Sequence, residues 1–159
     1  KYYRRVDFEN QTENRPPRGW GVPTPGFEFS LGQGKAPQGQ GYARLIMKNA
    51  GQAPFGNFMT MIPAKDFAGK RVRLTAWIRS DTPNTYAQMW LRVDRIDGLM
   101  GFFDNMVDRP VKHSDGWVEA VIEGPVDTDA TFVAIGVMAV RAGDVSIDDF
   151  RIVILESEN

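Results

Sequence analysis

The sequence predicts an all-β fold, an antiparallel β-sandwich of the jelly-roll type with about nine to eleven short strands. Three observations support this prediction. The 159 residues include 16 Gly and 10 Pro, with 11% aromatic residues, a composition that favours turns and strands over helices. Several runs alternate apolar and polar residues with the period of a strand. These runs recur at a spacing of roughly 8–15 residues. We expect a single domain over residues 1–159, a length that buries one hydrophobic core.

The first part of the chain contains four expected strands, separated by loops rich in Gly and Pro. Segment 10–26, "NQTENRPPRGWGVPTPG", and segment 32–41, "GQGKAPQGQG", have the composition of loops, and neither contains a phosphate-binding motif. In "YARLIMK", residues 42–48, apolar residues recur at alternate positions, which indicates a strand. The expected strands in this part span residues 5–9, 27–31, 42–48 and 56–62.

The clearest strand signal is "KRVRLTAWIRS", residues 70–80. Its apolar face would consist of Val72, Leu74, Ala76 and Ile78, and its other face would carry arginines, a threonine and a tryptophan. The turn-forming segment "DTPNT", residues 81–85, follows. We therefore expect residues 70–80 to pair with residues 86–94 as an antiparallel hairpin. The remaining expected strands span residues 116–124, 131–140 and 144–155, the last of which is expected beside the first strand of the chain.

Composition excludes several classes of function. The net charge is −1, and no basic run is longer than Arg4–Arg5, so we expect no nucleic-acid partner. The absence of Cys excludes a disulfide scaffold, a zinc–thiolate site and a cysteine nucleophile. No apolar run approaches the roughly 18 residues of a membrane-spanning helix. The chain opens without Met and without a signal peptide, and we expect a mature piece of a secreted or periplasmic protein.

We expect no catalytic centre. His113, Ser114 and Asp115 are consecutive, whereas a catalytic triad requires three groups that converge in space. A small glycan hydrolase or lyase is the weakest of the alternatives. It would need two carboxyl groups facing each other across a cleft, and the candidates are Asp94, Asp97, Asp104 and Asp108.

The pattern also predicts a ligand-binding face on the expected hairpin. Trp77 and Trp90 lie on the faces of their strands opposite the apolar residues. Tryptophan rings stack on the C–H faces of sugars, and amide, guanidinium and carboxylate groups bind the hydroxyls. The candidate ligand-binding residues are Trp77, Arg79, Gln88, Trp90, Arg92, Asp94, Asp104 and Asn105. In the alternative interpretation the tryptophans only cover the sheet or support a loop, and Asp104 accepts hydrogen bonds from Arg92.

A metal site is the second candidate. Glu9 closes the first expected strand, and Asp148 and Asp149 open the last. If these strands are neighbours, the carboxylates could bind Ca²⁺ together with backbone carbonyls, because this ion prefers oxygen ligands. The alternative is a solvated acidic turn.

Several motifs together resemble a known family. "VDFE", "GKRVRLTAWIRS", "WLRVD", "FDNMVDRP" and the final "IDDF" resemble a bacterial jelly-roll domain of the galactose-binding-like class, which is similar to many carbohydrate-binding modules. This subtype is often loosely labelled as a transcriptional regulator, or is found beside peptidase or esterase domains. The resemblance implies a β-sandwich without a catalytic centre, with calcium near Glu9 and Asp148 or Asp149.

The function expected from the sequence is therefore that of a non-catalytic module that binds an oligo- or polysaccharide. We expect structural Ca²⁺ as its cofactor and a fused or associated catalytic domain as its partner. The competing class is a structural or protein-interaction domain of a larger extracytoplasmic enzyme, with no sugar ligand. No helix-turn-helix motif or basic surface supports the regulator label.

Overall fold

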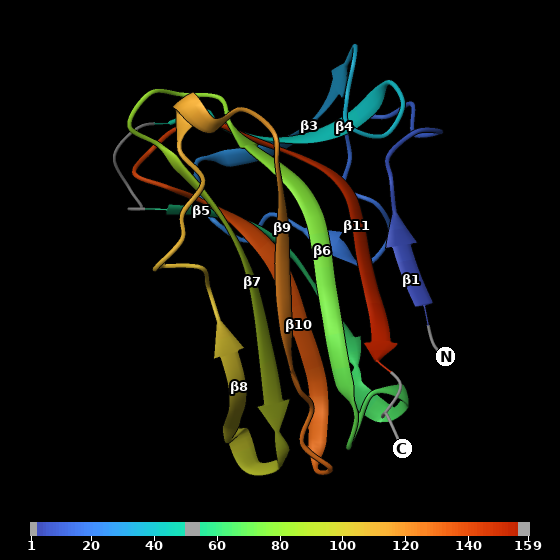
Figure 1. Cartoon of the computed structure of the whole chain (residues 1–159). Helices are drawn as coiled ribbons and strands as arrows, with labels where there is room; N and C mark the ends of the chain where they lie inside the picture. Colours follow the sequence, from blue (N-terminus) through green and yellow to red (C-terminus); the bar gives the residue numbers. More distant parts are fainter. Residues whose placement is uncertain (1–2, 50–54, 156–159) are drawn as a thin grey trace.

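The computed structural model describes residues 3–49 and 55–155. Within these ranges the chain forms eleven strands in two antiparallel sheets, which pack face to face as a β-sandwich (Figure 1). This arrangement confirms the fold class predicted from the sequence. The only helical elements in the described ranges are three short 3₁₀ turns: η1 (Ala64–Asp66), η2 (Ile96–Gly98) and η3 (His113–Asp115).

Sheet A has six strands and lies toward the viewer in Figure 1. Its strand order is β3-β4-β11-β6-β9, and β1 pairs with β11 beside this path. The strands are β1 (Tyr3–Val6), β3 (Phe27–Gln33), β4 (Gly41–Met47), β6 (Arg71–Ser80), β9 (Val118–Pro125) and β11 (Val145–Leu155). The first and last strands are therefore neighbours, as the sequence predicts, and Val6 faces Phe150 in the ladder.

Sheet B has five strands in the order β2-β5-β10-β7-β8 and forms the rear layer in Figure 1. Its strands are β2 (Trp20–Gly21), β5 (Phe55–Pro63), β7 (Tyr86–Arg95), β8 (Met100–Asp104) and β10 (Ala130–Val140). The long central pair of β10 and β7 is in register from Phe132–Asp94 to Val140–Tyr86.

The core lies between the two sheets and contains the apolar faces that the alternation predicts. On β6 these residues include Leu74 and Ile78, and on β7 they include Met89, Leu91 and Val93, all fully buried. Complete removal of such a side chain from water stabilises a fold by about 1.5–3 kcal/mol. These positions therefore fix which face of each strand points outward.

The expected hairpin between residues 70–80 and 86–94 is wrong. Strand β6 pairs with β11 and β9 in sheet A, whereas β7 pairs with β10 and β8 in sheet B. The connection at residues 81–85 therefore crosses from one sheet to the other. The outward faces of β6 and β7 lie on opposite sides of the sandwich, because the inward faces of both strands meet in the core.

Within residues 3–49 and 55–155, none of the helices is long and apolar enough to cross a membrane.

Candidate ligand groove and metal site

A groove of about 550 Å³ crosses the outer face of sheet B. The middle of this face is hollowed because β10 has only small residues there. These are Ala134 and Gly136, which lie directly beside Arg92 and Trp90 of β7. A Cβ atom at Gly136 would lie 2.9 Å from the Trp90 ring, so the glycine makes room for the indole. The groove is lined by Phe55, Asn57, Met59, Gln88, Trp90, Arg92, Phe103, Asn105, Val107, Met138 and Val140.

Trp90 forms part of the floor of the groove and is only 5% exposed. Its Nε1 donates a hydrogen bond to Oδ1 of Asn57 over 2.9 Å, and the Arg92 guanidinium lies 5.7 Å from the ring centre. The indole is therefore held against the sheet and offers a ligand little surface. Alternation identified the direction of this side chain, but it could not show how deeply neighbouring residues bury it.

The exposed aromatic surface of the groove belongs to two phenylalanines. Phe55 on β5 is 43% exposed, and Phe103 on β8 is 45% exposed. The sequence analysis missed Phe55, which opens its strand directly after residues that the structure does not describe. Both side chains lie on the same face of the sheet as Trp90, because Phe103 pairs with Arg92 and Phe55 is linked through β10 to Tyr86, and both partners alternate with Trp90 on β7.

The polar groups of the groove are oriented by bonds within the protein. Nε2 of Gln88 donates to the backbone carbonyl of Asn105 over 3.0 Å and ties the segment after β8 to the sheet. Arg92 donates to Asp94 through Nε and Nη2, over 2.6 and 3.1 Å. These contacts hold the Arg92 guanidinium in the groove, whereas Gln88 is only 5% exposed and fastens the neighbouring segment.

Asp104 does not bind Arg92. Its carboxylate accepts hydrogen bonds from the backbone N–H of Met106 and from Arg109, which also binds Asp108. Partial burial by itself would raise the pKa of Asp104, but the bonds from Arg109 and the Met106 N–H outweigh it and hold that pKa below its usual range. Asp104 therefore fastens the turn after β8, and the predicted pair of Asp104 with Arg92 is wrong because Arg109 takes that position.

Trp77 and Arg79 lie outside the groove, so the prediction that all eight residues share one face is wrong. Both residues belong to the outer face of sheet A, because β6 and β7 are in different sheets. Nε of Arg79 donates to Asp81 over 2.7 Å, and its guanidinium lies 4.5 Å from the Trp117 ring and 5.6 Å from the Tyr42 ring. Arg79 therefore takes part in a clasp of two aromatic rings and a carboxylate.

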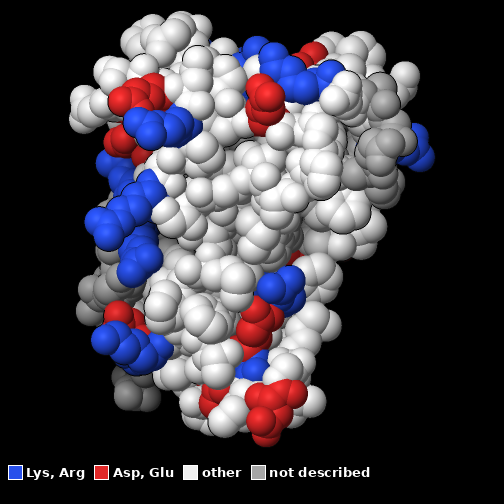
Figure 2. Space-filling model, turned by 180° about the vertical axis from the view of Figure 1, so that it is seen from behind, with Lys and Arg blue, Asp and Glu red and all other residues white. Residues whose placement is uncertain are grey.

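The groove side of the molecule carries little charge. Figure 2 shows uncharged residues over most of this side, with Lys, Arg, Asp and Glu mainly toward its ends and edges. The outward residues of β5 and β10 in the groove are apolar apart from Asn57. A ligand of this surface would therefore be recognised by apolar contact and by a few directional hydrogen bonds rather than by net charge.

The predicted metal residues meet where β1, the β3–β4 loop and β11 come together. Asp148 is completely buried, and its Oδ2 accepts a hydrogen bond from the backbone N–H of Gln38 over 2.9 Å. The Glu9 carboxylate accepts bonds from the backbone N–H groups of Gln40 and Gly41, over 2.9 and 2.7 Å. A Cβ at Gly39 would lie 1.7 Å from this carboxylate, so the loop can close over Glu9 only with glycine at that position.

Among the described residues, Oδ1 of Asp148 and the side-chain Oε1 of Gln38 are each buried without a hydrogen-bond partner. Burial raises the pKa of Asp148 to about 7, and the negative charges of Asp149 and Glu9 add to this effect. A buried oxygen without a partner is unfavourable unless a cation or a donor satisfies it. Carboxylate and amide oxygens are calcium ligands, so Asp148, Gln38 and Glu9 fit the ion chemically.

Asp149 does not share this environment. It has a φ of 53° within a β-bulge of β11, where the pairing with β6 shifts by one residue between Asp148 and Arg151. Nε of Arg5 and Nη2 of Arg151 donate to its two oxygens over 2.7 and 2.8 Å. Within residues 3–49 and 55–155, no three Asp, Glu, His or Cys side chains gather as a metal-binding group.

Solved structures of carbohydrate-binding modules share this fold. The C-terminal family 22 module of Clostridium thermocellum Xyn10B matches with a TM-score of 0.73 and 17% identity, over 99% of this chain and 96% of that one. A xylan-binding domain of the same family matches with a TM-score of 0.73 and 15% identity, over 99% and 97% of the two chains. The chain has the fold of a family 22 carbohydrate-binding module. The resemblance stated from the sequence is thereby confirmed for the fold.

Comparison by sequence gives a relative with a different name. No family model matches the chain. The uncharacterized HTH-type transcriptional regulator YbfP of Bacillus subtilis (strain 168) is 30% identical over 125 residues, which cover 77% of this chain. The match spans 42% of the length of YbfP, so more than half of that protein has no counterpart here. The described part of the carbohydrate-binding-module fold contains no helix-turn-helix.

Most of the carboxylates that were candidates for a hydrolytic site are paired with arginines. Asp94 is paired with Arg92, and both Asp104 and Asp108 bind Arg109. The segment His113–Asp115 is an exposed 3₁₀ turn, in which the Asp115 carboxylate accepts the backbone N–H of Lys112. These contacts give structural roles to Asp94, Asp104, Asp108 and Asp115.

Proposed function

We propose that the chain is a non-catalytic module that binds an oligo- or polysaccharide in the groove on sheet B. The observation that carries this proposal is the groove itself, with two exposed phenylalanines on different strands and oriented polar groups between them. Phe55 and Phe103 supply apolar surface for the C–H faces of sugar rings. Arg92 and Asn105 supply hydrogen bonds to hydroxyls, and the buried Gln88 and Trp90 support the floor.

A glycan array that includes xylohexaose tests this proposal. We expect the parent protein to bind at least one glycan, and Phe103→Ala to weaken that binding by about fivefold, since a ring contact contributes roughly 1 kcal/mol. Phe132→Ala is the matched control, because Phe132 is 39% exposed on the outer face of the same sheet but does not line the groove. Absence of binding by the parent, or equal losses in the two variants, would contradict the proposal.

The context of the module also belongs to this proposal. One structure with a similar fold contains a family 22 module together with a GH10 module in complex with xylohexaose, and this chain covers 27% of it. We infer that the chain works next to another domain, which supplies any catalysis, in a secreted or periplasmic protein. Mass spectrometry of the native protein in cell fractions would test this location.

A second candidate is an accessory domain that binds no sugar. The deep burial of Trp90 favours it, because a residue expected to stack on a ligand is instead bonded to Asn57. The partial match to a protein named as a regulator also favours a role within a larger chain. A glycan array without any bound ligand, together with an intact fold by circular dichroism, would support this candidate over the first.

We further infer a structural Ca²⁺ ion bound by Asp148, Gln38 and Glu9. Support comes from the two buried oxygens without partners and from the closely fitting loop around Glu9. The ion would compensate the buried negative charge and would fasten the β3–β4 loop to β11. Asp149 is not included, since its carboxylate is held by two arginines.

A further inference from the structure

We propose that the groove on sheet B is selective for sugars that carry acetyl groups. This inference rests on the proposed glycan-binding function and names the class of glycan. An acetyl group has a carbonyl oxygen, which only accepts hydrogen bonds, and an apolar methyl group. The groove offers the complement of both, because it combines side-chain N–H donors with aliphatic surface.

The side-chain amide of Asn57 on β5 keeps its nitrogen available as a donor. Its Oδ1 accepts the hydrogen bond from Nε1 of Trp90 over 2.9 Å. An indole N–H can only donate, so this contact fixes which end of the amide is the oxygen. Among the described residues, Nδ2 of Asn57 contacts only the sulfur of Met59, at 3.3 Å, and a thioether is a weak acceptor.

The amide of Asn105 is oriented in the same way on the β8 side of the groove. Its Oδ1 accepts the backbone N–H of Val107 over 3.2 Å, and a backbone N–H also can only donate. Its backbone carbonyl accepts the bond from Gln88. Nδ2 of Asn105 has no hydrogen-bond partner in the part of the chain that the structure describes, so it is a second donor.

Arg92 on β7 supplies a third donor. Its Nε and Nη2 bind the two oxygens of Asp94, whereas Nη1 bonds to none of the described residues. The Asp94 carboxylate offsets the charge of the guanidinium, and the other two donors are neutral amides. The three groups therefore suit a neutral acceptor such as a carbonyl oxygen.

Side-chain acceptors for a sugar hydroxyl are scarce in the groove. Its described lining contains no carboxylate and no hydroxyl group. The remaining amide oxygen belongs to Gln88, which is only 5% exposed. A free hydroxyl has one O–H that needs an acceptor, and burying it without one is unfavourable. Acetylation replaces this O–H by an ester, so it removes the unmatched donor and adds a carbonyl oxygen for the N–H groups.

The aliphatic surface of the groove suits a methyl group. Met138 of β10 lies in register between Asn57 of β5 and Gln88 of β7. Met59 and Val140 also line the groove, and these three apolar side chains are partly exposed. Methionine side chains are flexible and adapt to small apolar groups, whereas aromatic rings suit the faces of sugar rings. The methionines would therefore cover the acetyl methyl beside a donor for its carbonyl.

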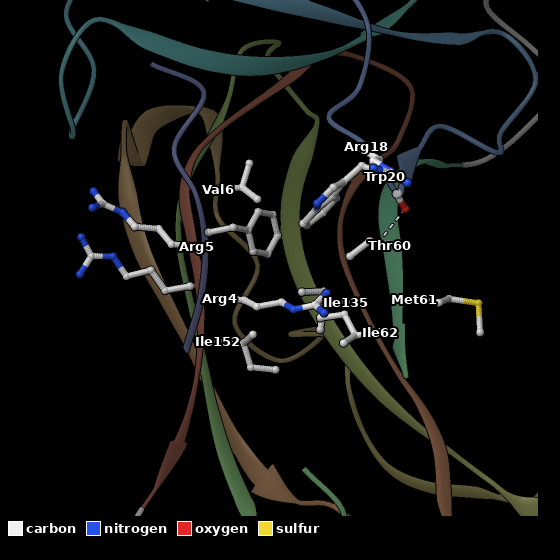
Figure 3. A pocket seen from close by; sticks show the side chains of 13 residues that line it. Arg4, Arg5, Val6, Arg18, Trp20, Thr60, Met61, Ile62, Ile135 and Ile152 are labelled. Atoms are coloured by element: carbon white, nitrogen blue, oxygen red, sulfur yellow. Dashed lines mark hydrogen bonds between the residues drawn. The ribbon is translucent and has the colours of Figure 1, made fainter. Parts of the chain in front are cut away.

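A second cavity of the molecule could also take a methyl group. It measures about 250 Å³, lies between the sheets and shares no residue with the groove (Figure 3). Figure 3 shows Ile62, Ile135 and Ile152 around it, together with the hydrogen bond of 2.7 Å from the Thr60 hydroxyl to the Gly19 carbonyl. A variant confined to the groove therefore decides between the two places.

Two matched pairs of ligands test the selectivity by isothermal titration calorimetry with the full chain. O-acetylated xylohexaose is compared with xylohexaose, and chitohexaose with cellohexaose, because the members of each pair share a backbone and only one carries acetyl groups. We expect the acetylated member of at least one pair to bind at least about tenfold more tightly. The first pair carries the acetyl group as an ester and the second as an amide, so the pairs also distinguish these two sources.

Asn105→Asp is the variant that removes one donor. It keeps the oxygen that accepts the Val107 N–H, and it is expected to weaken binding of the acetylated ligand by about tenfold. Asn57→Asp gives the same expectation if Asn105→Asp does not fold. Asn14→Asp is the matched control and leaves the preference unchanged. Asn14 also accepts a backbone N–H, that of Leu31 over 2.9 Å, but it is exposed and does not line the groove.

The outcomes separate this proposal from the proposed function. Equal binding within both pairs, still weakened by Phe103→Ala, would overturn the acetyl selectivity and leave the glycan-binding function standing. Binding on the glycan array without binding of either acetylated ligand would do the same, and absence of all binding would overturn both. An unchanged preference in both asparagine variants would overturn the assignment of the acetyl group to the groove. Tighter binding of hexagalacturonate than of the acetylated ligands would mean that the donors select a carboxylate instead.

Discussion

Asp148 is the residue whose position is hardest to explain by packing. It lies on β11 among completely buried residues, and a charged carboxylate there loses its hydration. The hydrogen bond from the Gln38 N–H satisfies one oxygen and leaves the other without a partner. Among the described residues that oxygen has no partner, and the proposed calcium ion would supply one and compensate the charge.

The raised pKa of Asp148 predicts how the metal-free protein responds to pH. Its folded-state pKa is about 7, compared with about 3.9 for an unfolded chain, so the folded state binds the proton more tightly. The contribution of Asp148 to stability is therefore complete below about pH 4 and is lost as the pH rises through about 7. In the presence of a chelator, we expect a loss of about 3–5 kcal/mol from this group, at about 1.4 kcal/mol per pKa unit.

Urea unfolding of the parent and of Asp148→Asn at pH 4.5, 6 and 8 measures this effect. Other carboxylates change the stability of both proteins alike, so the informative quantity is the difference between them. The free energy of unfolding of the variant is expected to increase relative to that of the parent as the pH rises. A difference that stays constant from pH 4.5 to 8 would contradict the assigned pKa.

At the scale of elements, alternation predicted strand faces well but could not assign strands to sheets. Residues 70–80 and 86–94 alternate regularly, and their apolar faces are in the core as expected. A short turn between two alternating runs favours a hairpin, yet a sandwich can use the same connection to join its two layers. Phe55 was missed because its place in the groove depends on the pairing of β5 with β10, two strands that lie far apart in the sequence.

The turn at residues 81–85 crosses between the sheets because its side chains are bonded to another loop. The Thr85 hydroxyl is buried and donates to the backbone carbonyls of Arg141 and Ala142, at 3.0 and 3.1 Å. The backbone N–H of Asp144 donates to the Thr82 hydroxyl over 3.0 Å. These bonds hold the turn against the β10–β11 connection rather than in a hairpin of its own.

Thr85→Val tests this anchoring with almost no change in side-chain volume. It removes the hydroxyl donor, leaves carbonyls with one bond fewer, and is expected to lower the free energy of unfolding by about 1–3 kcal/mol. Thr131→Val is the control, because the Thr131 hydroxyl also donates to a carbonyl, that of Asp94, but at an exposed position. Urea denaturation should show a change within about 0.5 kcal/mol for the control. Equal effects in the two variants would mean that the buried bonds do not hold the turn.

At the scale of the whole molecule, the proposed glycan groove and the proposed calcium site occupy separate places. The groove lies on the outer face of sheet B, and the proposed calcium ligands lie where the β3–β4 loop meets β11. None of the residues that line the groove is a proposed calcium ligand. We therefore expect that each proposed site can be removed without the other.

This separation predicts the result of metal removal. Dialysis against EDTA is expected to lower the melting temperature, because the buried charge of Asp148 is no longer compensated and the β3–β4 loop loses its link to β11. At a temperature well below melting, affinity for any glycan identified on the array should change less than about twofold, since no groove residue binds the ion. Calorimetry and a glycan titration of the same sample measure both quantities, and Asp148→Asn serves as the control that no longer responds to calcium. An unchanged melting temperature would contradict the calcium proposal alone, whereas a loss of glycan binding in the still-folded protein would show that the two sites are coupled.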